Sequence, residues 1–425
     1  MLNKIIKDKL SSKLSGDVIL TFSVQFTIML LLFITNKILS QNLCVEDFGL
    51  FNVVKRSVAV ISFVMLAGTG IALPRYSALY IGNKNNNRVK TFQITSLLFV
   101  FIVSLIIVSI GLCFQKKLSP LICNNDNELY YLAYIYAFAV SCSSFLYAYY
   151  RGLSDFKNFN YSQLIIQLAL TIPLFFLKLS VKDVFSYWTF ITFIIVIIYF
   201  TYEIIEKKFY NFKIHFLNLK KEIKELVVYS LPRLLGDFFL FSFTAFPLIY
   251  LKNNMDLKSV AYYSVGLTII TMATPLFSIL GTILLPYVSE SLAKNELKKA
   301  QVFINKLTII YITLSILLTI FIYLLINHLI ILFFSEDYIL ASDISKILIL
   351  SIVPQSMYYL FRNPIDAVSV FPFNTIILGL SLAIIIALFY FSHTLEGYAW
   401  SYVFVSIFQG IMSFLVWKTL KKYKK

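Results

Sequence analysis

The sequence predicts an all-α integral membrane protein with about twelve transmembrane helices in two six-helix lobes. Three observations support this prediction. Of 425 residues, 59% are hydrophobic and 14% are charged, whereas about a quarter of the residues of a soluble domain are charged. About twelve stretches are long and apolar enough to cross a bilayer, which takes about 20 residues. Several landmarks also recur at half the length of the chain.

The apolar stretches follow one another along the whole chain, with short polar loops between them. Ten stretches contain no Asp, Glu, Lys or Arg: 18–36, 57–74, 91–115, 129–150, 158–177, 184–202, 259–289, 307–335, 367–395 and 397–417. Two more, 226–251 and 342–363, are interrupted by charged residues. Inside a bilayer a single apolar segment satisfies its backbone hydrogen bonds only as a helix, so each stretch is predicted as a transmembrane helix.

Basic residues collect in alternate loops, which predicts the orientation. One set of loops, including both terminal segments, holds 26 of the 37 Lys and Arg residues, and the other set holds seven. Because basic loops stay in the cytoplasm, both termini of this multi-pass protein are predicted to be cytoplasmic. The even number of helices agrees with this. The net charge of +16 is explained by topology, so no nucleic-acid partner is expected.

The longest loop, 203–225, is the natural place to divide the chain. It is too short to fold as a catalytic domain, so a transporter is expected rather than an enzyme. The predicted division is an N-terminal six-helix lobe at 1–206, a cytoplasmic linker at 207–225 and a C-terminal six-helix lobe at 226–425.

The two halves share landmarks at an offset of 212 residues. The aligned pairs are Pro74 and Pro286, Ser77 and Ser289, and Asn83 and Asn295. A glycine-bearing turn is predicted before each proline, at Gly68 and at Gly281. Because each half has six helices, both halves enter the membrane from the same side. The repeat is therefore parallel, with a pseudo-twofold axis normal to the membrane. That architecture favours transport by alternating access.

Two motifs carry a resemblance to a known family. The run LCVEDFGLF at 43–51, followed by GTGIALPRYS at 68–77, resembles the first two-helix signature of Wzx-type polysaccharide-biosynthesis flippases. These flippases belong to the multidrug/oligosaccharidyl-lipid/polysaccharide exporter superfamily. Residues 259–264 and 286–289 extend the resemblance to the second half. Cys44 departs from the family, which often has Gly there, and the chain lacks room for the fourteen helices expected of peptidoglycan-precursor flippases.

The resemblance implies a V-shaped exporter fold, a place in the bacterial inner (plasma) membrane and a substrate. The substrate would be an undecaprenyl-pyrophosphate-linked oligosaccharide repeat unit, moved from the cytoplasmic to the periplasmic leaflet, as in O-antigen or capsule synthesis. Membrane lipid, a polysaccharide polymerase and a chain-length regulator would be its other partners. No cofactor, catalytic residue or metal site is expected, apart from a coupling proton or sodium ion.

Lys55 and Arg56 are candidates for contacting the substrate. They lie about eight residues into the second predicted helix, roughly 12 Å from its outer end at 1.5 Å per residue. A pyrophosphate concentrates negative charge, which suits a planar guanidinium and a compact ammonium. The alternative is that both side chains extend to the membrane interface.

Arg233 and Asp237 are one helical turn apart on the seventh predicted helix, with Pro232, Gly236 and Pro247 nearby to disturb its backbone. An interrupted helix near the midplane is typical of transporter binding sites. Arg233 is therefore a candidate for attracting the pyrophosphate, and Asp237 for binding the coupling ion. The alternative is an internal ion pair that neutralises itself.

Three further arginines, Arg75, Arg151 and Arg362, are predicted at the cytoplasmic ends of helices, with Arg362 in a short break before Pro364. They are candidates for capturing the pyrophosphate head group. The alternative is that they anchor the helices on the positively charged side of the membrane.

Two other functions remain open at this point. A cation-coupled multidrug antiporter of the same superfamily would place an acid inside the first lobe, and the predicted helices three to six contain no internal Asp or Glu. This favours an anionic substrate. A membrane glycosyltransferase or polymerase could use Glu46 and Asp47 in the first outward loop, but such enzymes need longer outward loops than these.

Overall fold

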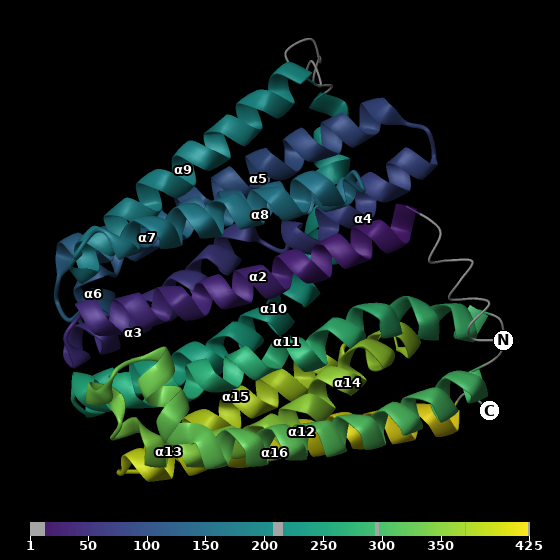
Figure 1. Cartoon of the computed structure of the whole chain (residues 1–425). Coiled ribbons are helices and arrows are strands. Elements are labelled where there is room, and N and C mark those ends of the chain that lie inside the picture. The colour runs from purple at the N-terminus through teal and green to yellow at the C-terminus, as the bar shows by residue number, and fades with distance from the viewer. Residues whose placement is uncertain (1–12, 207–215, 294–296, 370, 424–425) are drawn as a thin grey trace. The chain divides into compact units, whose positions relative to one another are not determined.

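The computed structural model describes residues 13–206, 216–293, 297–369 and 371–423 (Figure 1), at some positions by their backbone alone. Within these ranges every regular element is a helix. Eleven of the helical segments are long and apolar enough to cross a membrane. The prediction of an all-α membrane protein is therefore confirmed.

The first half of the chain contains α2 (Lys13–Asn42), α3 (Val45–Leu66), α4 (Thr69–Gly82), α5 (Asn86–Cys113), α6 (Gln115–Cys123), α7 (Asn127–Gly152), α8 (Phe156–Thr171), η1 (Ile172–Phe175) and α9 (Val181–Glu206). The second half contains α10 (Phe216–Asn254), α11 (Leu257–Ala293), α12 (Leu297–Phe333), η3 (Glu336–Tyr338), α13 (Ala341–Leu348), η4 (Ile349–Ser351), α14 (Ile352–Val368), α15 (Phe373–Phe391) and α16 (Leu395–Tyr423).

The count of spans agrees with about twelve. The stretch expected at 158–177 forms α8, which has only 16 residues, and the four-residue 3₁₀ helix η1. Helix α8 by itself is shorter than every other span, so it is not among the eleven helical segments that are long and apolar enough to cross a membrane.

The chain divides into two compact units. Unit 1 comprises Met1–Leu43 and Ser57–Leu234, and unit 2 comprises Cys44–Arg56 and Leu235–Lys425. Two helices therefore belong to both units: the first part of α3 lies in unit 2, and the first part of α10 lies in unit 1. The division predicted from the longest loop stays a prediction, and of the linker 207–225 the structure describes only the helical residues from Phe216 onward.

The glycine-bearing turn expected before Pro74 is confirmed. Ala67 and Gly68 have φ angles of 50° and 71°, in the left-handed region that ends a right-handed helix. The Thr69 hydroxyl donates to the carbonyl oxygen of Leu66 at 2.7 Å and satisfies one group left open by the break. The second predicted span is thus divided into α3 and α4.

The matching turn at Gly281 is not found, because α11 runs without a break from Leu257 to Ala293. Glycine permits a positive φ but does not impose one. In hydrocarbon an unbroken helix pairs more backbone groups than a turn does. The proposed repeat therefore lacks this landmark in the second half.

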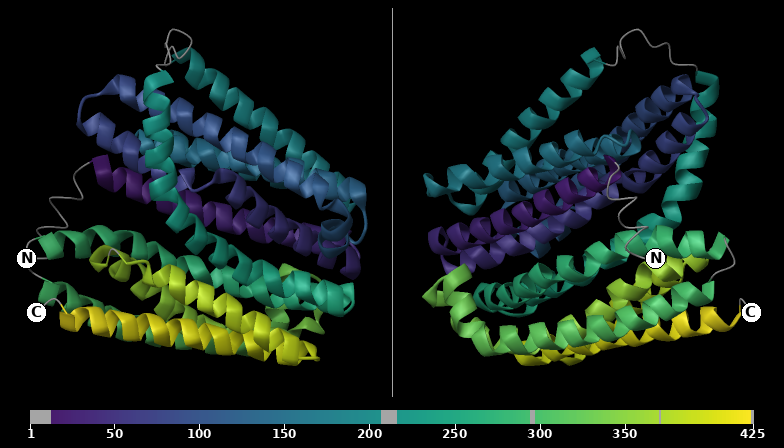
Figure 2. Two further views of the ribbon diagram at one scale, coloured as in Figure 1. Left: turned by 180° about the vertical axis from the view of Figure 1, so that it is seen from behind. Right: turned by 45° about the vertical axis from the view of Figure 1, so that its right-hand side comes forward.

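The interruptions expected in two other helices are also wrong. Helix α10 runs from Phe216 to Asn254, past Pro232, Gly236 and Pro247, and its teal to green ribbon has no gap in either view of Figure 2. Helix α14 continues past Pro364 to Val368, so Arg362 lies inside a helix and not in a break. A proline removes one backbone donor, but membrane helices tolerate this because neighbouring groups compensate.

Unit 1 is built around α7, which packs against α4, α5, α8 and α9. Its buried core includes Phe92, Phe145 and Tyr150. Helix α2 packs on α8 and is joined to it by hydrogen bonds: Thr35 to Thr171 at 2.8 Å, and Gln25 to Gln163 at 2.9 Å. Interhelical hydrogen bonds of this kind stabilise helix pairs in membranes, where apolar contact alone discriminates poorly.

Unit 2 is built around α14, which packs against α11, α12 and α16. The first part of α3 belongs to this unit through close contacts. The ring of Phe48 lies 5.3 Å from that of Tyr338 and 6.1 Å from that of Phe334. Gly49 faces the backbone of Leu257 so closely that any Cβ would collide with its carbonyl oxygen.

We expect Gly49→Ala to lower the free energy of unfolding by about 2 kcal/mol, because α3 and α11 would have to separate. Thermal unfolding of the detergent-solubilised protein measures this change. Gly16→Ala is the control, since nothing lies within 4 Å of a Cβ at Gly16, and alanine there should stabilise the helix by up to about 1 kcal/mol. Equal stability of the two variants would contradict the close approach.

Candidate functional site

The basic pair Lys55 and Arg56 lies on the part of α3 that belongs to unit 2, and both side chains are half-buried. The Lys55 ammonium lies 5.5 Å from the centre of the Phe51 ring. The Arg56 guanidinium is within electrostatic range of the hydroxyl groups of Tyr263, from α11, and Tyr402, from α16. The pair is thus held among aromatic rings rather than extended into a loop.

Tyr402 connects Arg56 to a buried hydrogen-bond network. The amide nitrogen of Gln355, on α14, donates to the Tyr402 hydroxyl at 3.2 Å and lies 3.3 Å from the hydroxyl of Ser406. The Tyr402 ring stacks on Phe243 with 4.8 Å between centroids. Tyr402 is only 2% exposed, so its position is fixed on all sides by packing.

The network continues along α14 toward Arg362. Tyr359 lies close to both Tyr402 and Arg362. A cavity of about 10 Å³ lies against Gln355, Tyr359 and Thr274, which is about the space of one water molecule. We call the set Arg56, Tyr263, Tyr402, Gln355, Tyr359 and Arg362 the polar track of unit 2.

Polar groups inside membrane helices cost free energy unless they serve a pathway or are paired. The track has an arginine at each end and neutral hydroxyl and amide groups between them. Those groups match an anion with many acceptor oxygens. Sequence reasoning found Arg56 and Arg362 but missed Gln355, Tyr359 and Tyr402, although a glutamine inside an apolar stretch was a signal.

The other candidate arginines, Arg75 and Arg151, lie in unit 1. The Arg151 guanidinium donates to the carbonyl oxygen of Gly70 at 2.9 Å and lies 5.7 Å from the centre of the Phe159 ring. Arg75 lies over the ring of Tyr76 at 5.7 Å. Arg151 thus ties α7 to the first turn of α4, which gives it a structural role whatever else it contacts.

The remaining candidates, Arg233 and Asp237, lie within the backbone of α10. Their side chains are outside the part of the chain that the structure describes. Their assigned roles therefore stay predictions.

Unit 1 contains buried acids, contrary to the expectation that helices three to six have none. Glu203 lies in the last turn of α9, inside the candidate span Val181–Glu206, and is 4% exposed. It accepts a hydrogen bond from the Tyr149 hydroxyl at 2.8 Å. The stretch without charged residues ended at position 202, so the sequence placed Glu203 in a loop. The helix and its burial continue further, which removes one argument against a cation antiporter.

Two more acids of unit 1 come from the start of α10 and face α4 and α5. Glu222 is 1% exposed and accepts from the Thr95 hydroxyl at 3.1 Å. Glu225 accepts from the Tyr80 hydroxyl at 2.6 Å and pairs with Arg88 at 2.9 Å. These contacts anchor the first part of α10 to unit 1.

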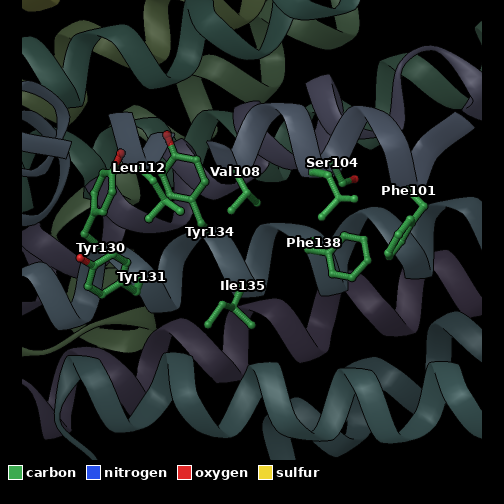
Figure 3. Close-up of a pocket in the computed structure, with 10 residues that line it drawn as sticks. Phe101, Ser104, Val108, Leu112, Tyr130, Tyr131, Tyr134, Ile135 and Phe138 are labelled. Carbon is green, nitrogen blue, oxygen red and sulfur yellow. The ribbon is translucent and has the colours of Figure 1, made fainter. Parts of the chain in front are cut away.

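A large groove on unit 1 lies between α5 and α7 and has a volume of about 360 Å³ (Figure 3). The Tyr130 hydroxyl donates to the carbonyl oxygen of Gly111 at 2.8 Å and fixes one wall. Phe101 and Phe138, 6.2 Å apart, close the other end. No residue that lines the groove carries a charge, so the groove offers nothing for a pyrophosphate.

Comparisons with known proteins add a family and a fold. A family model described as polysaccharide biosynthesis protein matches residues 14–292. Among solved structures, the chain is similar to an inward-facing multidrug resistance MATE family transporter of the MOP superfamily. The two share 14% identity over 96% of this chain and 100% of that one, with a TM-score of 0.76.

Two further likenesses agree with this one. A mutant of the MATE transporter VcmN from Vibrio cholerae has 14% identity over 95% of this chain and 97% of its own, with a TM-score of 0.67. A MATE transporter in complex with MaD5 has 15% identity over 93% and 96%, with a TM-score of 0.61. At these identities the likeness establishes the exporter fold alone. A search of the curated proteins finds no match.

Burial raises the pKa of the Glu222 carboxyl, so the folded protein holds this proton more tightly than the unfolded chain does. Ionisation of Glu222 as the pH rises therefore costs stability. We expect Glu222→Gln to raise the unfolding temperature at pH 7 and to lose this advantage at about pH 4, where the carboxyl is protonated even in the unfolded chain.

Glu225→Gln is the matched comparison and should act in the opposite direction. It removes the charge that pairs with Arg88 and should lower the free energy of unfolding at pH 7 by about 1 kcal/mol. Thermal unfolding of both variants across this pH range provides the measurement. Destabilisation by Glu222→Gln at pH 7 would contradict the assignment.

Proposed function

The chain belongs to the polysaccharide biosynthesis protein family, and we propose that it is a flippase for lipid-linked oligosaccharide. Its fold is that of multi-pass transporters of the MOP superfamily, so it is a transporter and not an enzyme. In the proposal it moves undecaprenyl-pyrophosphate-linked repeat units from the cytoplasmic to the periplasmic leaflet of a bacterial inner membrane. Both termini would be cytoplasmic, as the distribution of basic residues predicts.

The polar track of unit 2 is the observation that supports this substrate best. A pyrophosphate offers only acceptor oxygens, and the track offers guanidinium, amide and hydroxyl donors. Arg56 and Tyr402 lie together at one part of the track, and Tyr359 and Arg362 lie together at another. Every side chain of the track is basic or neutral, which suits an anion and disfavours a cationic substrate.

The proposed roles follow from these positions. Arg56, assisted by Lys55, would bind the pyrophosphate, and Arg362 would hold it at another stage of transport. Arg233 would attract the same group and Asp237 would bind a coupling proton or sodium ion, while Arg75 and Arg151 would guide the head group toward the protein. A polysaccharide polymerase and a chain-length regulator would use the translocated unit.

We expect Arg56→Ala to reduce translocation about tenfold or more, because a charge-assisted hydrogen bond contributes about 1.5 to 3 kcal/mol. The measurement is the amount of lipid-linked oligosaccharide and of surface polysaccharide in a deletion strain that carries each variant on a plasmid. Arg56→Lys should recover part of the activity, and Lys117→Ala, an exposed position in unit 1, should retain all of it. Full activity of Arg56→Ala at normal protein levels would overturn the assigned role.

The cation-coupled multidrug antiporter remains the second candidate. Its support is the likeness to MATE transporters and the buried carboxylate of Glu203 in unit 1. The same deletion strain separates the two candidates. If the protein is a flippase, its deletion leads to accumulated repeat units with no surface polymer and leaves the efflux of cationic dyes unchanged. If it is an antiporter, its deletion leaves the surface polysaccharide normal and alters the tolerance to those dyes.

A further inference from the structure

A second groove of unit 1 lies between α5, α7 and α9 and has a volume of about 310 Å³. Most of its lining is apolar and includes Leu97 from α5 and Phe200 from α9. Three polar side chains line it as well: Gln93, Tyr149 and Glu203. This combination of a hydrocarbon wall and a small polar group is the pattern of an amphiphile site.

Glu203 contributes the one carboxyl group among the residues that line the groove. Its carboxylate accepts a hydrogen bond from the Tyr149 hydroxyl at 2.8 Å, and the Tyr150 hydroxyl lies close to it as well. Among the described residues no Lys or Arg forms a salt bridge with it. A positively charged partner stabilises a carboxylate in apolar surroundings, so a positively charged occupant suits the groove.

Gln93 adds a donor beside this charge. Its side chain is 5% exposed, and its amide nitrogen has no hydrogen-bond partner among the residues that the structure describes. A buried donor without a partner costs about 1 to 3 kcal/mol, which an occupant with an acceptor oxygen would recover. The polar part of the groove therefore fits a group that joins an ammonium to an adjacent acceptor.

The position of the groove along the helices matches the depth of a lipid head group. Gln93 lies in the second turn of α5, and Glu203 lies in the last turn of α9. Both helices are candidate membrane spans, so these residues lie near the bilayer surface. Leu97 is 39% exposed and Ile204 is 47% exposed at the mouth of the groove, which opens it toward the surrounding lipid.

We propose that this groove is a binding site for a phospholipid with an ethanolamine head group. The ammonium of the lipid donates to the Glu203 carboxylate, which Tyr149 holds in place. The phosphate accepts from the Gln93 amide, and an acyl chain lies against Leu97 and Phe200. The proposal does not depend on the transported substrate, because it concerns a lipid-facing groove of unit 1 alone.

The test uses the purified full-length protein in detergent with an equal mixture of dioleoyl phosphatidylethanolamine and dioleoyl phosphatidylcholine, and counts the retained lipids by native mass spectrometry. We expect about tenfold preferential retention of the ethanolamine lipid, because three methyl groups remove every N–H donor from the choline lipid. The mono- and dimethylated ethanolamine lipids should give intermediate retention.

Glu203→Gln should bring the retention of the two lipids close to equal, since it removes the charge but keeps an acceptor for Tyr149. Glu206→Gln, three residues further along α9 and exposed, is the matched control and should keep the preference. Gln93→Leu should reduce the retention of both lipids alike, because both carry a phosphate. Thermal unfolding in phosphatidylcholine micelles checks that each variant is folded.

Equal retention of the two lipids by the unaltered protein would overturn the proposal, as would an unchanged preference in a folded Glu203→Gln variant. Displacement of the lipids by tetraphenylphosphonium from the unaltered protein, but not from the Glu203→Gln variant, would also overturn the proposal. It would indicate a site for lipophilic cations instead. If Glu203→Gln does not fold, the methylated lipid series on the unaltered protein decides the question.

Discussion

The structure depends on one constraint: inside hydrocarbon, every backbone N–H and C=O must find its partner within the protein. This requirement keeps α10 continuous past two prolines and α11 continuous past Gly281. A break is tolerated where side chains replace the lost hydrogen bonds, as Thr69 does for Leu66 at the turn between α3 and α4. The same constraint applies to polar side chains, and several that are buried pair across helices, as Thr35 does with Thr171.

The polar groups that the structure describes differ between the two units. In unit 1 they include buried carboxyl groups paired with hydroxyls, as in Glu203 with Tyr149 and Glu222 with Thr95. In unit 2 they include the half-buried Arg56 and the neutral donors around Tyr402. These described groups suit separate tasks, because a carboxylate binds a proton or another cation, whereas guanidinium, amide and hydroxyl groups bind an anion.

This contrast bears on the choice between a flippase and an antiporter. The family match and the polar track of unit 2 favour an anionic, lipid-linked substrate. The fold agrees with either function, because one exporter architecture carries many substrates. The buried Glu203 is the feature that an antiporter could use. A lipid ammonium is an equally good partner for this carboxylate, so the presence of this acid does not by itself imply a cationic substrate.

The sequence alone determined the properties that depend on composition and local pattern. Hydropathy identified the membrane helices, and the Gly-Thr-Gly segment at 68–70 identified the turn before Pro74, because both signals are local. The burial of Glu203 and the network of Gln355 and Tyr402 depended on which helices pack together. Gln355 and Tyr402 are 47 residues apart in the chain, and no local pattern links them. Only the tertiary structure decided these contacts, since burial and pairing come from neighbours far away in sequence.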